Sequence, residues 1–379
     1  MKFTCKQEDL NRMLGIVNHA VAKGTGALPI ATNIRITTDQ ENRIRLDATN
    51  LSIGITGWIE ATITEEGSVA VPKLFNDLIS VLTPGQIEIA VDEETYDVQI
   101  DGLRGSVHVR GVDPEQFPPM PGGEPHAQPT LLKSALLKEV IREVSIAVDE
   151  TGTREVFANI LMQIEQTQIT FVAADGYGKL AFRTLPLPET SGCTGDILVP
   201  ARSLAELASI LPTDGIAEIQ LTPSQVIFST QKVVLSSMLS SGSFPNYKAA
   251  LPREKPTRLT VKTAEFREVV QLTTLLARSD SNAGHLVIKG SPGVEPGKLT
   301  IASEVADIGG NCNTIAAAIE GDDQEDLVFN VAHLARVLAV ISAPELIFEV
   351  GVMKAPVGVM RAVGSYTCIH SFSSMGAAR

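Results

Sequence analysis

Apolar residues recur at helical spacing in three similar segments of the chain. The segment at residues 199–211, VPARSLAELASIL, begins with Val-Pro, which is typical of a helix start, and carries its leucines on one side. The same pattern occurs in VPKLFNDLISVL and FNVAHLARVLAVI, so that Phe75, Leu204 and Leu334 lie 129 and 130 residues apart. In the first copy we expect the apolar side to comprise Phe75, Leu78, Val81 and Leu82. Three copies at nearly constant spacing predict three repeated units.

A second helical pattern precedes each of these segments. Residues 7–21, 134–148 and 263–277 each carry an apolar stripe, and Leu10, Leu137 and Phe266 are equivalent at offsets of 127 and 129 residues. Each repeat therefore contains two amphipathic helices at a fixed separation.

Short runs of alternating apolar and polar residues surround the helices. Pairs such as Ile34 and Ile36, or Leu299 and Ile301, predict half-buried strands, and turn sequences such as Pro84-Gly85 separate them. The pattern predicts an α+β fold in which sheets are covered by two helices per repeat. Phe-Pro sequences at Phe117 and Phe244, 127 residues apart, close the first two repeats. We expect domains at residues 1–122, 129–252 and 257–379.

Composition narrows the setting of the protein. The net charge of −13 argues against a wholly basic nucleic-acid binder but allows positive charge to gather on one surface. No apolar run approaches the ~20 residues of a membrane span, and the N-terminus lacks an apolar signal core, so we expect no membrane contact. The 4 cysteines are far apart and favour a reduced, cytoplasmic setting.

Several motifs, in this order, carry a family resemblance over essentially the whole chain. They are MKFT at the start, LPIATNI at 28–34, AADGY at 173–177, the Val-Pro helices and SFPNYKAALP at 243–252. Together with the three-fold repeat, they resemble the bacterial sliding clamp, the β subunit of DNA polymerase III. The resemblance implies three similar domains with helices inside and sheets outside. It also implies a head-to-tail homodimer that closes a ring around duplex DNA and binds polymerase and clamp-loader subunits through short linear peptides.

Positive charge on the helices is the candidate DNA surface. The helix faces opposite the apolar stripes carry Asn11, Asn18, Lys138, Arg142, Ser145, Arg267, Gln271, Thr274 and Arg278, and the second helices add Lys73, Arg202 and Arg336. Such a lining would attract phosphates without reading sequence. The resemblance adds two loop residues, Lys23 and Arg154. The alternatives are that these cations occupy ordinary solvated helix faces and that the Lys23 loop is a plain loop.

By resemblance, an apolar cleft between the second and third domains binds the partner peptides. Its residues map to Phe157, Ala174, Gly176, Tyr177, Lys179, Leu180, Pro245, Ala249, Ala250 and Met375. Two departures from the family pattern, an extra residue in DGYGKLA and the tail HSFSSMGAAR, imply an altered partner preference. Alternatively, Phe157 and Leu180 are ordinary core residues.

The resemblance also predicts how the ring closes. An edge strand at residues 105–111 would present Val107 and Val109, flanked by Arg104 and Arg110. Its partner surface on the other chain would be Leu275 and Leu276, with Glu304 and Asp307 nearby. Apolar residues at the centre and opposite charges at the edge suit a sheet edge that must be covered. The alternative is that the two leucines belong to the core of the third repeat.

Nothing in the sequence indicates catalysis, a cofactor or a metal. The 6 histidines have no metal-ligand spacing, no Gly-x-Ser-x-Gly elbow occurs, and we expect Asp47 and Asp175 to organise turns at strand ends. A DNA polymerase processivity clamp is therefore the predicted function. Two other classes stay open: a divergent clamp paralogue that acts mainly as a protein-binding scaffold, and a tandem-repeat enzyme with a site between repeats.

Overall fold

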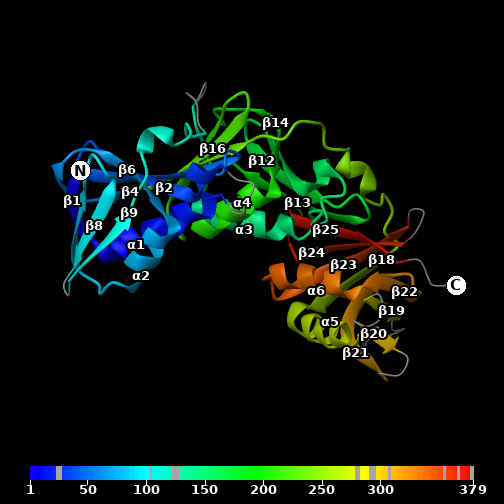
Figure 1. The fold of residues 1–379 in the computed structure, drawn as a ribbon. Helices are drawn as coiled ribbons and strands as arrows, with labels where there is room; N and C mark the ends of the chain where they lie inside the picture. The colour runs from blue at the N-terminus through cyan, green and yellow to red at the C-terminus, as the bar shows by residue number, and fades with distance from the viewer. Residues whose placement is uncertain are drawn as a thin grey trace. The chain divides into compact units, whose positions relative to one another are not determined.

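The computed structural model describes residues 1–22, 28–102, 105–121, 128–277, 282–289, 296–305, 309–352, 356–364 and 368–375. The chain divides into two compact units (Figure 1). Unit one comprises Met1–Leu137, Leu187–Cys193 and Glu206–Leu239, and unit two comprises Lys138–Pro186, Thr194–Ala205 and Ser240–Arg379. The boundary between the units passes through the middle repeat, so the three-domain division remains a prediction.

The predicted amphipathic helices are present. They are α1 (Gln7–Val17), α2 (Lys73–Val81), α3 (Ser134–Ser145), α4 (Ala201–Ile210), α5 (Thr263–Ala277) and α6 (Val331–Val340). The helices α1 and α3 end earlier than their apolar stripes predicted, and a 3₁₀ turn at Asn18–Ala20 follows α1.

The predicted buried face of α2 was partly wrong. Phe75 and Ile79, which are four residues apart and therefore on one side of the helix, are fully buried, whereas Val81 is 77% exposed. Val81 follows Ile79 by two residues, about 200° around the helix, and therefore points away from the sheet. The prediction counted an apolar residue on the opposite side of the helix as part of the buried stripe.

Unit one contains a five-stranded and an eight-stranded antiparallel sheet in the described residues. The first has the order β5 (Thr62–Glu65), β1 (Lys2–Lys6), β7 (Gln86–Val91), β8 (Asp97–Gly102) and β9 (Gly105–Arg110). The second has the order β10 (Thr130–Lys133), β15 (Ile216–Leu221), β16 (Gln225–Ser229), β17 (Val233–Met238), β4 (Ile53–Glu60), β3 (Arg43–Thr49), β2 (Asn33–Asp39) and β6 (Ser68–Pro72). Strands from the first and second repeats thus share one continuous sheet, joined where β17 pairs with β4.

Asp47 corrects one expectation in this sheet. It lies inside β3 rather than at a turn, and its side chain is buried. Its carboxylate accepts hydrogen bonds from Arg35 at 2.8 Å, Arg45 at 3.0 Å and the Thr56 hydroxyl at 2.8 Å. A buried carboxylate is stable only when it is paired in this way, and two arginines on neighbouring strands provide the pairing.

The described residues of unit two form one twelve-stranded sheet. Its order is β14 (Gly195–Pro200), β11 (Asn159–Ile164), β12 (Gln168–Ala174), β13 (Lys179–Pro186), β25 (Cys368–Ser373), β24 (Pro356–Ala362), β23 (Glu345–Val352), β18 (Thr257–Lys262), β21 (Gly309–Gly321), β20 (Gly297–Val305), β19 (Ala283–Lys289) and β22 (Gln324–Asn330). The pairing of β13 with β25 joins the second and third repeats, just as the pairing of β4 with β17 joins the first and second.

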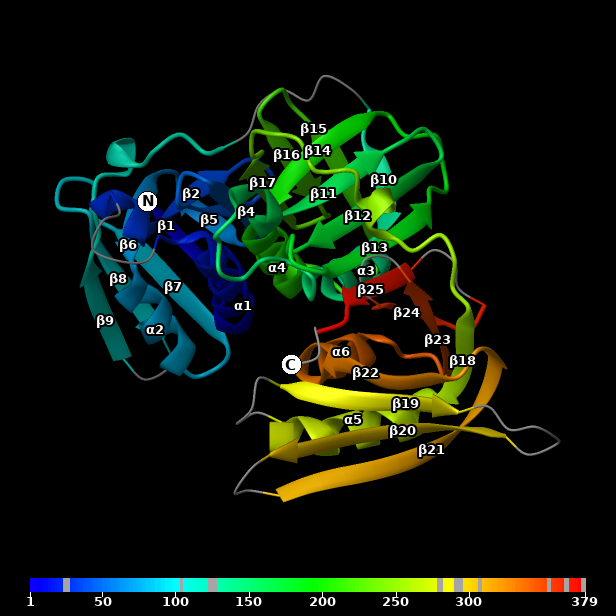
Figure 2. The ribbon, with the colours of Figure 1, turned by 90° about the vertical axis from the view of Figure 1, so that its right-hand side faces the viewer.

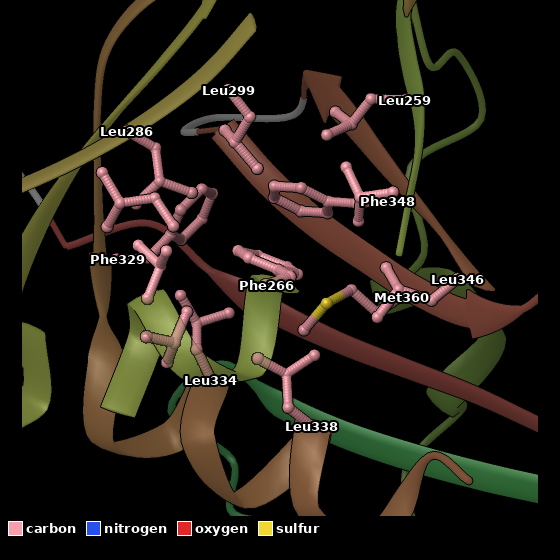
Figure 3. Close-up of a cluster of buried hydrophobic side chains, with 14 of the residues drawn as sticks. Leu259, Phe266, Leu286, Leu299, Phe329, Leu334, Leu338, Leu346, Phe348 and Met360 are labelled. Carbon is pink, nitrogen blue, oxygen red and sulfur yellow. The ribbon is translucent and has the colours of Figure 1, made fainter. Parts of the chain in front are cut away.

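The core of unit two lies where α5 and α6 pack beside each other against this sheet (Figure 2). Phe266 of α5 stacks on Phe348 of β23 with ring centroids 6.3 Å apart, and leucines from α6 surround them (Figure 3). Thr274 was expected on the exposed side of α5, but it is buried and its hydroxyl donates to the Val270 carbonyl at 2.7 Å. This local hydrogen bond lets a polar side chain lie on the buried face.

Candidate functional site

A tight turn between β12 and β13 carries the candidate site. Asp175 is buried, and its Oδ1 accepts backbone N–H groups from Tyr177 at 2.8 Å, Gly178 at 3.0 Å and Lys179 at 2.9 Å. This confirms that Asp175 organises a turn at a strand end. Gly176 has φ +73°, and a Cβ there would lie 2.4 Å from the Phe157 ring. Glycine therefore lets the turn close tightly over Phe157.

Next to this turn lies an apolar cavity of about 200 Å³. Its lining includes predicted cleft residues from three separate parts of the chain: Phe157, Ala174, Gly176, Lys179, Leu180, Pro245 and Ala250. Leu180 is buried and packs in a cluster with Leu161, Val172, Leu198 and Tyr247. The floor of the cavity is thus part of the core, so Leu180 serves packing and lines the cavity at once.

Sequence reasoning missed Phe244 and Tyr247, which also line the cavity. The rings of Phe157 and Phe244 meet edge to face at 5.7 Å, and the Tyr247 hydroxyl donates to Gln163 at 3.2 Å. Both residues lie in SFPNYKAALP, from which the resemblance had supplied only Pro245, Ala249 and Ala250. Two aromatic residues flanking a Pro-Asn pair were the available indication that this segment packs against the fold.

A second pocket of about 440 Å³ adjoins the first, sharing Gly178, Lys179 and Ser373. Predicted residues Tyr177 and Met375 line this second pocket rather than the first. The Met375 backbone N–H donates to the Val328 carbonyl at 2.7 Å, which ties the tail to β22. Ala249 is exposed beside the cavity-lining Ala250, yet in the described part of the chain it lines neither pocket.

His333 and Asn330 of α6 and its N-cap line the second pocket and were not predicted. Burial, with Lys179, His370 and Arg336 nearby, lowers the pKa of His333 to about 3. The imidazole is therefore neutral at pH 7, and it presents a polar but uncharged edge beside the aromatic ring of Phe372.

Arg154 lies at the rim of the cleft. Its guanidinium stacks over the exposed Tyr177 ring at 4.8 Å from the centroid and donates to the Gly176 carbonyl at 3.3 Å. The structure therefore places Arg154, predicted as a DNA contact, against the cleft turn.

The predicted helix cations fall into three groups. Lys73, Arg142 and Arg202 are exposed and Lys138 is half-buried. Arg267 instead donates to the Leu338 and Ile341 carbonyls, each at 2.9 Å, so its charge caps the C-terminus of α6. Lys23 and Arg278 lie outside the described residues, as do Arg104 and Asp307 from the predicted ring contact.

The predicted ring-closing surfaces lie on an edge strand and a helix. β9 is the outermost strand of its sheet, with Val109 buried and Val107 and Arg110 exposed. In β20, Glu304 is exposed. On α5, Leu275 is 64% exposed, and Leu272, which sequence analysis missed, is 47% exposed. Leu276 is half-buried. The exposure of Leu275 argues against a place in the core of unit two.

Two negative findings apply only to the residues described above. No group of three or more histidine, cysteine, aspartate or glutamate side chains there could hold a metal ion. None of the helices there is long and apolar enough to cross a membrane.

Comparisons with known proteins identify the family. Two family models match: the N-terminal domain of the DNA polymerase III β subunit over residues 1–121 and its central domain over residues 131–246. The β sliding clamp of Synechocystis is 27% identical over 378 residues, covering 94% of this chain and 95% of that one. That of Staphylococcus aureus is 28% identical over 370 residues, covering 93% and 94%. The crystal structure of the Bacillus subtilis sliding clamp superposes with a TM-score of 0.90 at 25% identity, covering 99% of each chain.

Paired helices packed on sheets that run from one repeat into the next define the chain as a clamp-fold protein. It belongs to the family of bacterial DNA polymerase III β subunits, the β sliding clamps.

Proposed function

We propose that this protein is a DNA sliding clamp, a ring that encloses duplex DNA and holds the replicative polymerase on it. The protein does no chemistry itself. It works by topology and effective concentration, because a polymerase tethered to the ring stays near the template after each dissociation. The observation that carries the proposal is the apolar cleft, where residues predicted from the clamp resemblance line one cavity and its neighbour.

The decisive test of this function is topological. The clamp, loaded by its loader onto primed circular DNA, should stay bound through a wash at high salt and leave when the circle is cut once. A protein held only by charge would leave in the wash, because phosphate contacts weaken steeply with salt. Retention on linear DNA after cutting would contradict the ring.

The DNA surface in this proposal comprises four predicted helix cations that are exposed or half-buried, Lys73, Lys138, Arg142 and Arg202, of which Arg142 also donates to the Ala339 carbonyl at 3.5 Å. Changing all four to alanine should lower loading while leaving the protein folded. A matched control changes Lys6, Lys133, Arg253 and Lys298, four exposed cations outside the α-helices. If both quadruple variants lose loading to the same extent, the net charge of the protein governs DNA association and these four positions do not.

The cleft, in this proposal, binds a short peptide of a polymerase or loader subunit. Apolar side chains of the peptide would enter the cavity over Leu180, and Arg154 and Lys179 would face its polar groups. Leu180→Asp should weaken binding of a clamp-binding peptide about thirty-fold or more, since losing an anchoring pocket costs ~2 kcal/mol. Leu51→Asp, at an exposed leucine of unit one, is the control. Equal affinity for both variants would place the peptide elsewhere.

Ring closure, in this proposal, pairs β9 of one chain with the Leu272 and Leu275 surface of α5 in the other. The exposed apolar side chains would carry most of the affinity. In sedimentation, Leu272→Ala with Leu275→Ala should convert a dimer into a folded monomer of 40.4 kDa. A persistent dimer would mean that the ring closes through other surfaces.

A further inference from the structure

Unit one contains a cavity of about 850 Å³ that the clamp function does not use. It lies between α1, the end of β4, the loop after α4 and the turn from β16 to β17. Its volume falls within the range typical of ligand sites, ~300–1,000 Å³. All the residues that line it belong to unit one, so the cavity is a feature of this compact unit.

The walls of this cavity combine apolar side chains with polar ones such as Ser229, Thr230 and Gln231. Met13 and Ile16 come from α1, Trp58 from β4, and Ile210 and Ile216 from either side of the loop after α4. Ile216 is 48% exposed, which is unusual for an isoleucine at the start of a strand. Together these side chains form an apolar surface whose hydration is unfavourable.

The rim of the cavity carries an excess of negative charge. Asp9 and Arg12 pair with each other at 2.5 Å, so their charges largely cancel. Among the described residues of the lining, the remaining ionised side chains are Glu60, Asp214 and Glu218, against the single cation Lys232. This balance disfavours phosphate and nucleic acid and favours a cationic ligand.

The corresponding place in the next repeat is built differently. The register of β3 with β4 pairs Leu46 with Gly57, and the register of β12 with β13 pairs Phe171 with Arg183, so Gly57 and Arg183 are equivalent positions. In unit two, Arg183 reaches back to the first helix of its repeat, whose carboxylates hold it. In unit one, Met13 of the first helix packs against the bare backbone of Gly57, since a Cβ there would lie 2.1 Å from the Met13 sulfur.

We propose that this cavity binds a short basic segment of a partner protein. One or two apolar side chains of the segment insert beside Ile16, Trp58 and Ile216, while flanking lysines or arginines meet the carboxylates of the rim. The site is separate from the cleft in unit two and would take peptides of opposite charge preference, because Arg154 and Lys179 border that cleft. It does not depend on the clamp function proposed above.

The test uses the intact protein and the fluorescence of Trp58, its only tryptophan. The probe is an acetylated, amidated peptide, Lys-Leu-Phe-Arg-Leu-Lys, compared with a twin in which glutamate replaces the three cations. The basic peptide should produce a saturable change in Trp58 emission, and the acidic twin should bind at least ten-fold more weakly. Ile216→Lys and Glu218→Lys should each weaken the basic peptide at least ten-fold, and the control Leu51→Lys should not.

Each of five results would overturn the proposal. The first is the absence of a saturable change, and the second is equal binding of both peptides. The third is unchanged affinity in Ile216→Lys and Glu218→Lys. The fourth is loss of binding in Leu180→Asp, which would place the peptide in the cleft of unit two. The fifth is complete displacement by spermidine at the peptide's own concentration, which would identify a small cation as the occupant.

Discussion

Two equivalent places in the repeat are built in opposite ways. In unit two, the guanidinium of Arg183 on β13 pairs with Glu139 at 3.0 Å and with Glu143, both on α3. In unit one, the equivalent strand position is Gly57, and a Cβ there would lie only 2.1 Å from the Met13 sulfur. The second repeat therefore joins its first helix to the sheet through an ion pair. The first repeat does so through close packing of the flexible Met13 side chain on the backbone of Gly57.

The difference shows what a repeat preserves. Helix, strand and register are the same in both places, because they depend on the spacing of apolar residues and on backbone pairing. The side chains at the contact between the first helix and the strand can differ, provided that they fill the space between the two elements. Unit two fills it with an ion cluster, and unit one fills it with the Met13 side chain.

The largest expected effect comes from breaking the ion cluster. Arg183→Ala would leave the Glu143 side chain, which is only 11% exposed, without its cation. We expect unit two to lose ~3 kcal/mol of stability, because removing one partner of a buried ion pair is costly. Hydrogen exchange in urea should show faster opening of β13, with β4 of unit one unchanged.

The control for this prediction replaces the whole pair. Arg183→Met with Glu143→Leu removes both charges and keeps the volume, and it should recover most of the lost stability. If Arg183→Ala costs less than 1 kcal/mol, or if β4 opens as readily as β13, the contrast between the two units is not one of buried charge.

This contrast marks the limit of prediction from sequence. Periodicity located the helices and some of the strands, because burial on one face leaves a regular pattern. It could not tell Glu139 and Glu143 from solvated charges, since an arginine 44 and 40 residues later completes the pair only in three dimensions. The prediction that Arg267 belongs to the DNA surface was wrong for the same reason, because its carbonyl partner lies on another helix.

The cleft was predictable only in part. The resemblance named residues whose positions are fixed by strand ends and by the turn at Asp175. The resemblance could not predict which of the two adjoining pockets each residue lines, because that depends on the side-chain directions of Tyr177 and Met375. The sequence could not predict that His333 lines the cleft, because a single histidine on an amphipathic helix has no recognisable motif.

The second expected effect is a difference in pH dependence between the units. Burial lowers the pKa of His333 to about 3 and that of His370 to about 4, below the ordinary value of 6.5. Below pH 6.5 the unfolded chain binds protons that the folded unit two does not, so stability falls as the pH falls. We expect unit two to lose about 1.4 kcal/mol per buried histidine between pH 7.5 and 5.5.

The measurement is hydrogen exchange of β13 and β4 at these two pH values, corrected for intrinsic exchange rates. His333→Gln should reduce the pH dependence of β13 by about half. Unit one is the comparison, because neither of its described histidines, His19 and His108, is buried. An equal pH response in both units would mean that groups other than the buried histidines set it.

The smallest expected effect concerns the exposed ion pair of α1. Arg12 is equivalent to Glu139 by the 127-residue offset, but it pairs with Asp9 on its own helix, and its side chain is 67% exposed. Water screens such a pair, so Arg12→Ala should change the stability of unit one by less than ~0.5 kcal/mol. Urea unfolding followed by Trp58 emission measures this directly. A loss comparable to that of Arg183→Ala would mean that charge also holds the first helix of unit one in place, and the two units would then be built alike.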